Sequence, residues 1–371
     1  MKRILIIDNS AGITGAFRVM LHVAHALRGE FSFYFAVPKG NGITASLLKD
    51  HGFPYIHVNF IEIGKNLKSV IYFPALLYNA VKLHRYCKKN NITIIHVNDI
   101  YNMTGVVLKI LNPNIKLIHH IRLTPQSYAG VLYRTWLKIL YYKADQIIVV
   151  SNVVKKEVIK TIHEQKVEML YDFISLPEYR FTEEAKTNVV RFLYPANFTP
   201  GKGHAYAVEA FRKALRENNH LELTFAGDDF DLKKNQLYKK SLINDAADLI
   251  DSGKIQFKTG IREVPELYAN YDVVLNFSES ESFSMTCYEA AWYGLPVIAT
   301  RCGGPEEIVV HGESGFLVNR GDVDAMANHM LELATDHAKR LNMKYRCREL
   351  IHQRASDYNT VGRYRQLYER S

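Results

Sequence analysis

Short apolar runs rich in β-branched residues alternate with amphipathic segments along most of the chain, and this alternation limits its fold more than any other feature. Strands that are apolar along their length and separated by helices indicate a parallel sheet covered on both faces. The first half therefore predicts a doubly wound α/β domain. Its predicted strands span 3–8, 31–37, 55–58, 92–97, 116–121 and 146–151, with helices at 16–27, 69–89 and 131–143.

The alternation weakens over residues 171–188, where Pro177 and a charged stretch replace it, and then restarts. The second set of predicted strands spans 189–196, 221–226, 255–259, 273–277, 296–299 and 316–318. We therefore predict two doubly wound domains, 1–175 and 185–355, followed by a C-terminal helix at 356–371 that is free to pack back on the first domain. Open α/β sheets bind ligands at the carboxyl ends of their strands, so two such domains predict a ligand cleft between them.

The composition is that of a globular protein, with 47% hydrophobic and 23% charged residues among 371. The four cysteines lie far apart, which predicts neither a disulfide framework nor a metal knuckle and suits reduced thiols in a cytosol. The N-terminal apolar run stops at Asp8, too early for a signal peptide. The longest apolar run, Val70–Val81, is too short to cross a bilayer of about 30 Å. We expect a cytoplasmic protein.

The net charge of +9 is unevenly distributed. Residues 1–172 hold 22 Lys and Arg against 10 Asp and Glu, whereas residues 173–371 hold 25 against 28. This asymmetry suits a partner that is anionic, although solubility alone is an equally open explanation. The segment 131–143 mixes aromatic and basic side chains, which suits peripheral contact with an anionic membrane as well as a core helix with a basic solvent face.

Two glutamates follow the predicted strand 273–277. Glu281 lies in the polar turn after the strand, and Glu289 lies about a turn and a half into a helix that starts near Ser284. Both carboxylates are placed to face one ligand at the rim of the cleft. A second explanation stays open for Glu289, because Thr286 to Glu289 also fits a capping box in which Glu289 binds only a backbone amide.

The stretch "ESFSMTCYEAAWYGLPVIATRCGGPEEIVVHGESGFLV" resembles the signature of the family 4 retaining glycosyltransferases of GT-B fold. Glu281 and Glu289 match its pair of glutamates, "GLP" follows, and Gly303, Gly304 and Glu307 match its GGxxE. Further segments, among them "GAFR", "HVN", "VSN", "GKG" and "GDD", occur in the family's order over nearly the whole chain. The resemblance implies two Rossmann-like domains, with acceptor bound by the first and a nucleotide-sugar donor by the second.

The resemblance also assigns donor-binding roles in the second domain. Lys202 matches the phosphate-binding lysine, with a solvated lysine in a turn as its alternative, and Glu289 matches the residue that binds the ribose hydroxyls. Glu281 matches the residue that contacts the donor sugar or stabilises positive charge at the anomeric carbon. The leaving diphosphate requires cations and N–H donors, and the start of the helix supplies N–H donors. This segment holds Phe283, Ser284, Met285 and Thr286.

In the first domain, Gly12, Thr14 and Gly15 open a helix after the first strand, a setting suited to anions or an acceptor hydroxyl, with Gly15 assigned to the donor. The family often carries a histidine facing the donor sugar at the end of the fifth strand. His120 is assigned to this role over His119, although a one-residue slip exchanges the two faces and a packed histidine is equally compatible. Arg122 is assigned to an anionic acceptor, with a surface arginine as the alternative.

One position departs from the family pattern. An arginine usually precedes the phosphate-binding lysine, but this chain has "PANFTPGKG", with Asn197 at the corresponding place. Asparagine donates hydrogen bonds to phosphate without adding charge, so full activity is in doubt. The D-x-D at 229–231 follows a predicted strand and is interpreted as a loop, so no metal and no cofactor are expected.

These features lead to one prediction and two alternatives. The predicted function is metal-independent, retaining transfer of a sugar from a nucleotide-diphosphate sugar to a glycan or a lipid-linked acceptor in cell-surface polysaccharide or lipopolysaccharide synthesis. A nucleotide-sugar epimerase on the same fold is the first alternative. The second is a non-catalytic protein that binds anions or a membrane. The sequence contains none of the recognised nucleic-acid motifs, so no nucleic-acid partner is expected.

Overall fold

The computed structural model describes residues 1–10, 12–39, 42–61, 71–125, 130–177, 188–259 and 264–371. The chain forms two compact units, one comprising Met1–Ile174 with Asn359–Ser371 and the other Ser175–Tyr358. The prediction of an α/β chain with two doubly wound sheets is confirmed. The start of the predicted helix at 69–89 and most of the predicted boundary at 171–188 lie outside the described residues.

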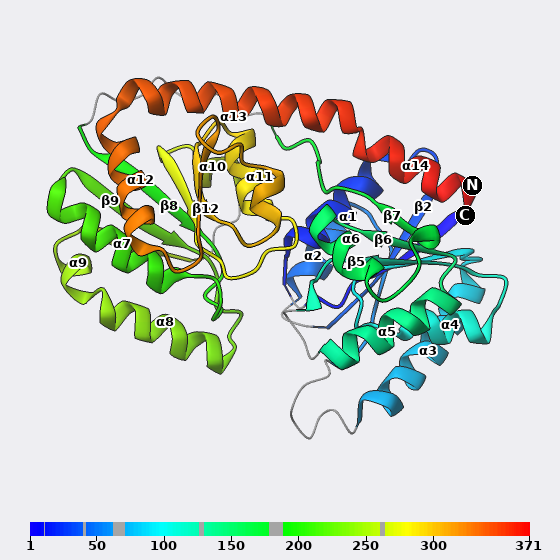
Figure 1. The fold of residues 1–371 in the computed structure, drawn as a ribbon. Coiled ribbons are helices and arrows are strands. Elements are labelled where there is room, and N and C mark those ends of the chain that lie inside the picture. The colour runs from blue at the N-terminus through cyan, green and yellow to red at the C-terminus, as the bar shows by residue number, and fades with distance from the viewer. Residues whose placement is uncertain (11, 40–41, 62–70, 126–129, 178–187, 260–263) are drawn as a thin grey trace. The chain divides into compact units, whose positions relative to one another are not determined.

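Unit 1 contains a seven-stranded parallel sheet in the order β3-β2-β1-β4-β5-β6-β7. Figure 1 shows α3, α4 and α5 next to one another along one side of this sheet. The strands are β1 Arg3–Ile7, β2 Ser32–Val37, β3 Tyr55–His57, β4 Ile94–Val97, β5 Lys116–Ile121, β6 Gln146–Val149 and β7 Val167–Met169. The helices are α1 Gly15–Ala26, α2 Ile43–Asp50, α3 Tyr72–Lys89, α4 Thr104–Leu111, α5 Gly130–Lys143, α6 Asn152–Ile159, the short 3-10 helix η3 Glu164–Lys166 and, from the chain's end, α14 Thr360–Arg370.

Unit 2 contains a six-stranded parallel sheet in the order β10-β9-β8-β11-β12-β13. Its strands are β8 Val190–Pro195, β9 Leu221–Ala226, β10 Ile255–Lys258, β11 Val273–Asn276, β12 Val297–Thr300 and β13 Gly315–Val318. Its helices are α7 His204–Glu217, α8 Lys233–Asp245, α9 Ala247–Asp251, α10 Val264–Tyr268, α11 Met285–Trp292, α12 Val323–Thr335 and α13 His337–Tyr358, with the short 3-10 helix η4 Gly304–Glu307. In both units the order reverses next to the first strand, which places a ligand-binding crevice at the carboxyl ends of the neighbouring strands.

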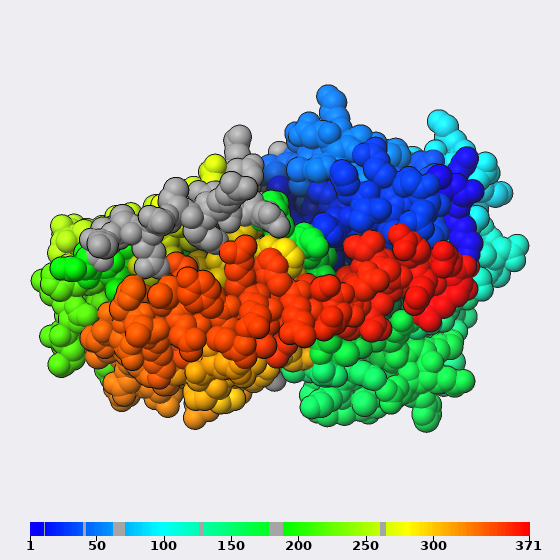
Figure 2. All heavy atoms as spheres, turned by 90° about the horizontal axis from the view of Figure 1, so that it is seen from above, coloured from blue at the N-terminus to red at the C-terminus, as the bar shows by residue number. Residues whose placement is uncertain are grey.

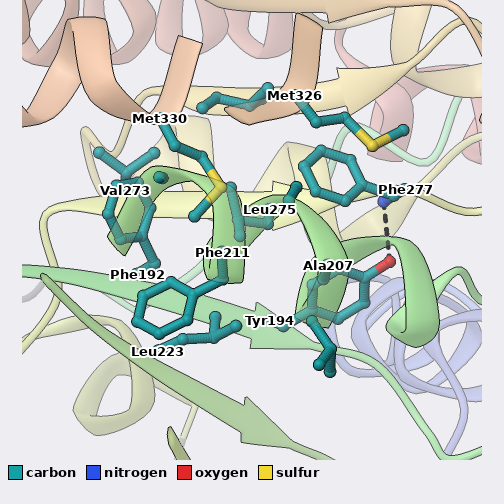
Figure 3. Close-up of a cluster of buried hydrophobic side chains, with 14 of the residues drawn as sticks. Phe192, Tyr194, Ala207, Phe211, Leu223, Val273, Leu275, Phe277, Met326 and Met330 are labelled. Atoms are coloured by element: carbon teal, nitrogen blue, oxygen red, sulfur yellow. Dashed lines mark hydrogen bonds between the residues drawn. The ribbon is translucent and has the colours of Figure 1, made fainter. Parts of the chain in front are cut away.

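The core of unit 2 holds its central strands in position. Phe192, Leu275 and Met330 come from β8, β11 and α12 and pack together without solvent exposure. Tyr194 of β8 lies in the same cluster, and its hydroxyl accepts a hydrogen bond from the Phe277 backbone N–H at 2.8 Å (Figure 3). This bond links the carboxyl ends of β8 and β11, from which the candidate site is built.

Helix α14 belongs to unit 1 although it ends the chain. Figure 2 shows this last helix, in red, lying against residues close to the N-terminus, in blue. The Lys2 ammonium donates to the Tyr368 carbonyl at 3.2 Å, and the Tyr368 ring packs edge-on against Phe31. Tyr364 and Tyr368 are fully buried, so the terminal helix is part of the hydrophobic core of unit 1.

Candidate active site

The loop after β8 carries Lys202 between two glycines with left-handed backbone. Gly203 has φ +74°, and a Cβ there would lie 1.9 Å from the Phe277 carbonyl oxygen, so only glycine fits. The Tyr194 hydroxyl donates to the Lys202 carbonyl at 2.5 Å. The loop is therefore fixed against β11, and α7 begins directly after it at His204.

Lys202 and Glu281 form the centre of the site. The Lys202 ammonium lies 2.7 Å from the Glu281 carboxylate, whose side chain is only 15% exposed. The Ser278 hydroxyl donates to the same carboxylate oxygen at 2.8 Å. Burial disfavours the charged lysine, but the Glu281 charge and hydrogen bond outweigh it and raise the pKa of Lys202. The lysine is thus a fixed cation within the unit.

The backbone of Glu281 is held by the loop after β12. Its N–H donates to the Cys302 carbonyl at 3.2 Å, and its carbonyl accepts from the Gly304 N–H at 2.8 Å. A Cβ at Gly304 would lie 2.4 Å from the Phe283 carbonyl group, so this contact also requires glycine. The carboxylate of Glu306 accepts from the N–H groups of Cys302 and Gly303, a local role that the sequence analysis did not assign.

Helix α11 begins beside this pair. Ser284 has φ +71° and is the N-cap, with its hydroxyl accepting from the Cys287 N–H at 3.4 Å and from the Asn276 amide at 2.8 Å. The Thr286 hydroxyl donates to the Pro195 carbonyl at 3.1 Å, which ties the helix start to β8. N–H groups in the first turn of a helix have no acceptor within the helix, so those of Met285 and Thr286 are suited to bind an anion.

Glu289 lies in the second turn of α11 and is buried. One of its carboxylate oxygens accepts from the Tyr268 hydroxyl at 3.0 Å. The capping-box alternative for this residue is wrong, because the N-cap is Ser284 and the Thr286 hydroxyl binds Pro195 instead. Tyr268 was not predicted as a site residue, since a tyrosine 21 positions away carries no local signal of this contact.

Asn197 lies two residues after β8, at the position where the sequence analysis expected an arginine. Its side-chain oxygen accepts from the Asp228 N–H at 3.1 Å, so the residue joins the loops after β8 and β9. The D-x-D is loop structure, as predicted: the Asp231 N–H donates to the Asp229 carboxylate at 3.0 Å. Within the described residues, no three His, Cys, Asp or Glu side chains lie close enough together to hold a metal.

The first-domain candidates lie at the carboxyl ends of β1 and β5. Thr14 is the N-cap of α1, which starts at Gly15 directly after it, and accepts from the Phe17 N–H at 3.2 Å. Gly12 is buried in the bend that precedes α1. Arg122 is also buried and ion-paired with Asp172, rather than a surface arginine. The roles of these four residues toward a donor or an acceptor stay predictions.

His120 and His119 are both fully buried. The His120 ring lies 3.3 Å from the Tyr364 hydroxyl of α14, and the His119 ring lies 2.8 Å from the Asp99 carbonyl. His96 adds a third buried ring, 2.9 Å from the Tyr368 hydroxyl. A role for His120 at the donor sugar stays a prediction, and in this structure its contact is with the terminal helix.

These buried histidines predict that the folded protein loses stability as the pH falls. Burial lowers the pKa of His96 to about 3 and that of His119 to about 4, from an ordinary value of 6.5. The unfolded chain therefore takes up protons below pH 6.5 that the folded chain does not, and stability falls as pH drops toward 4. We expect the free energy of unfolding to decrease by about 1 kcal/mol per histidine between about pH 7 and about pH 5.5.

Urea unfolding at the two pH values measures this decrease. A His96→Phe variant has one such proton site fewer, so its loss of stability between the two pH values should be smaller than that of the wild type. If the pH dependence of this variant equals that of the wild type, His96 does not contribute to the loss of stability in acid.

Two family descriptions match consecutive parts of the chain. "Glycosyltransferase Family 4" matches residues 13–178, and "Glycosyl transferases group 1" matches residues 176–350. The chain belongs to the family 4 glycosyltransferases. The second match contains the Lys202 loop, Glu281 and all of α11, so the candidate site lies within the family's own region.

Individual relatives agree with this membership. This glycosyltransferase is 26% identical to N-acetyl-alpha-D-glucosaminyl L-malate synthase of Bacillus anthracis over 85% of this chain and 84% of the relative. The structure of Anabaena HepE with UDP and glucose superposes with a TM-score of 0.83 and 18% identity over 100% of both chains. The lipopolysaccharide outer core galactosyltransferase WaaB superposes with a TM-score of 0.66 and 18% identity, over 98% of this chain and 100% of WaaB. These superpositions confirm the GT-B fold.

Proposed function

We propose that this glycosyltransferase transfers a sugar from a nucleotide-diphosphate sugar to a glycan or lipid-linked acceptor, with retention at the anomeric carbon and without a metal. One observation carries the proposal: the ion pair of Lys202 and Glu281 lies between the carboxyl ends of β8 and β11, beside the start of α11. This arrangement supplies a cation, N–H donors and a carboxylate at a single place in unit 2.

Each group has a role in the proposed transfer. The diphosphate gains negative charge as the bond to the sugar breaks, and Lys202 and the first-turn amides of α11 stabilise that charge. The anomeric carbon gains positive charge at the same time, and the Glu281 carboxylate is the anionic group that can stabilise it. Glu289 accepts hydrogen bonds from the ribose hydroxyls, since an ionised carboxylate only accepts.

A uridine nucleotide is our first choice of donor. HepE has been solved with UDP and with UDP-glucose, and its fold matches this chain along its whole length. The lysine and the helix amides bind the diphosphate part, which UDP-, GDP- and ADP-sugars share. The base and the sugar therefore have to be found by experiment.

We propose a cell-surface acceptor, with the enzyme in the cytoplasm and in peripheral contact with the membrane. The basic surplus of residues 1–172 suits an anionic partner, and WaaB, whose fold this chain shares, acts in the lipopolysaccharide outer core. No helix among the described residues has the length and hydropathy to cross a membrane. Contact with lipid would therefore involve the surface of the protein.

A donor screen by thermal shift tests the proposal. A ligand that binds only the folded state raises its melting temperature, so one class among UDP-, GDP- and ADP-sugars should raise it, with and without EDTA. We expect Glu289→Ala to lower the affinity for that nucleotide roughly tenfold to a hundredfold, because this is the contribution of a hydrogen bond to a charged group. Glu279→Ala, which removes an exposed carboxylate from the loop that precedes α11, is the matched control.

Product analysis tests the reaction type. Transfer with retention gives a product with the anomeric configuration of the donor, which NMR measures directly. A new sugar isomer formed from the donor without an acceptor would instead identify an epimerase.

The donor screen also has an outcome that would contradict the role of Glu289. If Glu289→Ala kept the wild-type affinity for every nucleoside diphosphate, the proposed ribose contact would be wrong.

A further inference from the structure

Helix α3 has large apolar side chains on its outer face. Phe73 and Leu77 are 61% and 57% exposed, and Val81 continues their stripe at four-residue spacing. Tyr78 lies beside the stripe and is also exposed. Five of the sixteen exposed large hydrophobic side chains recorded for the described residues lie between residues 71 and 81, on or directly before α3. Apolar patches on a soluble surface mark sites of interaction.

The opposite face of α3 already packs against unit 1. Tyr72, Ala80, Leu83 and Cys87 are buried, so the core is complete without Phe73 and Leu77. An ordinary surface helix has one apolar stripe and a polar outer face. Helix α3 therefore has a second apolar stripe that no described part of the chain covers.

The charge around this stripe is basic. Helix α3 itself has four Lys and Arg and no acidic residue. Arg85, Lys88 and Lys89 are exposed at the carboxyl end of α3. Helix α4 packs beside α3, and α5 beside α4, along the same side of the sheet. The carboxyl half of α3 is therefore basic beside the exposed apolar stripe.

We propose that the outer face of α3 is the surface by which this protein lies on an anionic phospholipid bilayer. Aliphatic and aromatic side chains flanked by Lys and Arg are the composition that enters the interfacial region of such a bilayer. A second copy of the chain would bring two basic surfaces together, and the repulsion disfavours it as the occupant. A bilayer with anionic headgroups satisfies both the apolar stripe and the charge.

The inner side of α3 connects this surface with the proposed acceptor. Tyr72, Leu76 and Asn79 of α3 line a small hollow of unit 1, together with Asn9 and Asn102 from the loops after β1 and β4. The side chains of Asn79 and Asn102 are buried there, each with a polar atom that has no hydrogen-bond partner among the described residues. A lipid-linked acceptor held in the bilayer would lie next to this hollow, a link that rests on the proposed function.

Vesicle sedimentation with the full chain tests the surface. We expect binding to vesicles of phosphatidylcholine mixed with phosphatidylglycerol, and much weaker binding to phosphatidylcholine alone. The double variant Phe73→Ser and Leu77→Ser should lose about tenfold or more in affinity for the mixed vesicles, since it removes two exposed apolar side chains. Changing Arg85 and Lys88 to Gln should cost roughly fivefold per charge and make the remaining binding less dependent on salt.

Unit 2 offers matched controls on α8. Leu232 and Leu237 are 56% and 59% exposed, and changing both to Ser removes the same kind of surface elsewhere. Binding that is lost equally in this control would contradict the proposal, as would a wild-type chain that does not sediment with the mixed vesicles. A dimer in light scattering that the Phe73 and Leu77 variant abolishes would assign the surface to a second copy instead.

The thermal shift with the nucleotide-sugar separates this inference from the proposed function. The Phe73 and Leu77 variant should keep the wild-type shift, because both side chains lie outside the donor site in unit 2. A chain that binds vesicles but no nucleotide-sugar would refute the proposed function and leave the surface standing. A chain that binds the donor but no vesicles would refute the proposed surface and leave the proposed sugar transfer standing.

Discussion

Replacing Lys202 by alanine should lower turnover on the order of a hundredfold, the effect of removing one preorganised group that stabilises developing charge. The structure places its ammonium 2.7 Å from Glu281 on a loop that Tyr194 and Phe277 hold in position. Asn197 adds no charge at the position where the sequence analysis expected an arginine, so Lys202 should carry more of the stabilisation. Steady-state kinetics with the donor identified by thermal shift measures the loss.

The ion pair also predicts how the effect of Lys202→Ala is divided between kcat and the affinity for the nucleoside diphosphate. A donor diphosphate and Glu281 compete for the same ammonium, so the gain from binding the ground-state diphosphate is partly cancelled. The gain grows as the leaving group becomes more negative, and kcat should therefore fall more than the affinity for the nucleoside diphosphate. Lys213→Ala removes an exposed lysine paired with Asp324 in the same unit and should leave both unchanged. Near-wild-type turnover of Lys202→Ala would exclude this role.

The sequence predicted the fold well because the evidence for a parallel sheet is local. Buried strands such as β4 and β11 are apolar at nearly every position, and their ends in the structure lie within two residues of the predicted ends. The strand β7, Val167–Met169, was missed because its three residues have the charged Glu168 at their centre and form no apolar run. Its place in the sheet follows from pairing with β6, which a single strand sequence does not encode.

The candidate site was predictable only where the family has a motif. Lys202 and Glu281 were identified from short patterns 79 positions apart, and the structure brings them into contact. Tyr268, Ser278 and Tyr194 bind site groups through single hydroxyls, which are too common in sequences to predict a partner. Their contacts depend on which strands are neighbours in the sheet, and that is a property of the whole fold.

The exposed apolar stripe of α3 shows a limit of periodicity. The sequence analysis left 131–143 open between membrane contact and a core helix. In the structure α5 buries Tyr133, Trp136 and Leu140 and turns Arg134 and Lys138 outward, while membrane contact of this helix stays a prediction. That is the core helix with a basic solvent face which the sequence left open. Helix α3 is apolar on two faces, and its pattern alone does not distinguish the face that packs from the face that is exposed.

Replacing Arg122 by alanine should destabilise unit 1 by about 3 to 5 kcal/mol, the cost of leaving one partner of a buried ion pair. Arg122 is ion-paired with Asp172, and its Nε donates to the Asn98 side-chain oxygen at 2.5 Å. Asn98 in turn donates to the Asp8 carboxylate at 2.6 Å, so the network joins the ends of β1, β4 and β5 to the segment after β7. Urea unfolding measures the loss.

A double variant separates this structural role from acceptor binding. Arg122→Met with Asp172→Leu replaces the pair by apolar side chains of similar volume, which often restores stability because neither charge remains unpaired. If Arg122 acts only within the network, the double variant should regain most of the stability and keep the wild-type KM for the acceptor. If it also binds an anionic acceptor, stability returns but the KM stays raised. A single Arg122→Ala variant as stable as the wild type would show that the buried pair contributes nothing to the fold.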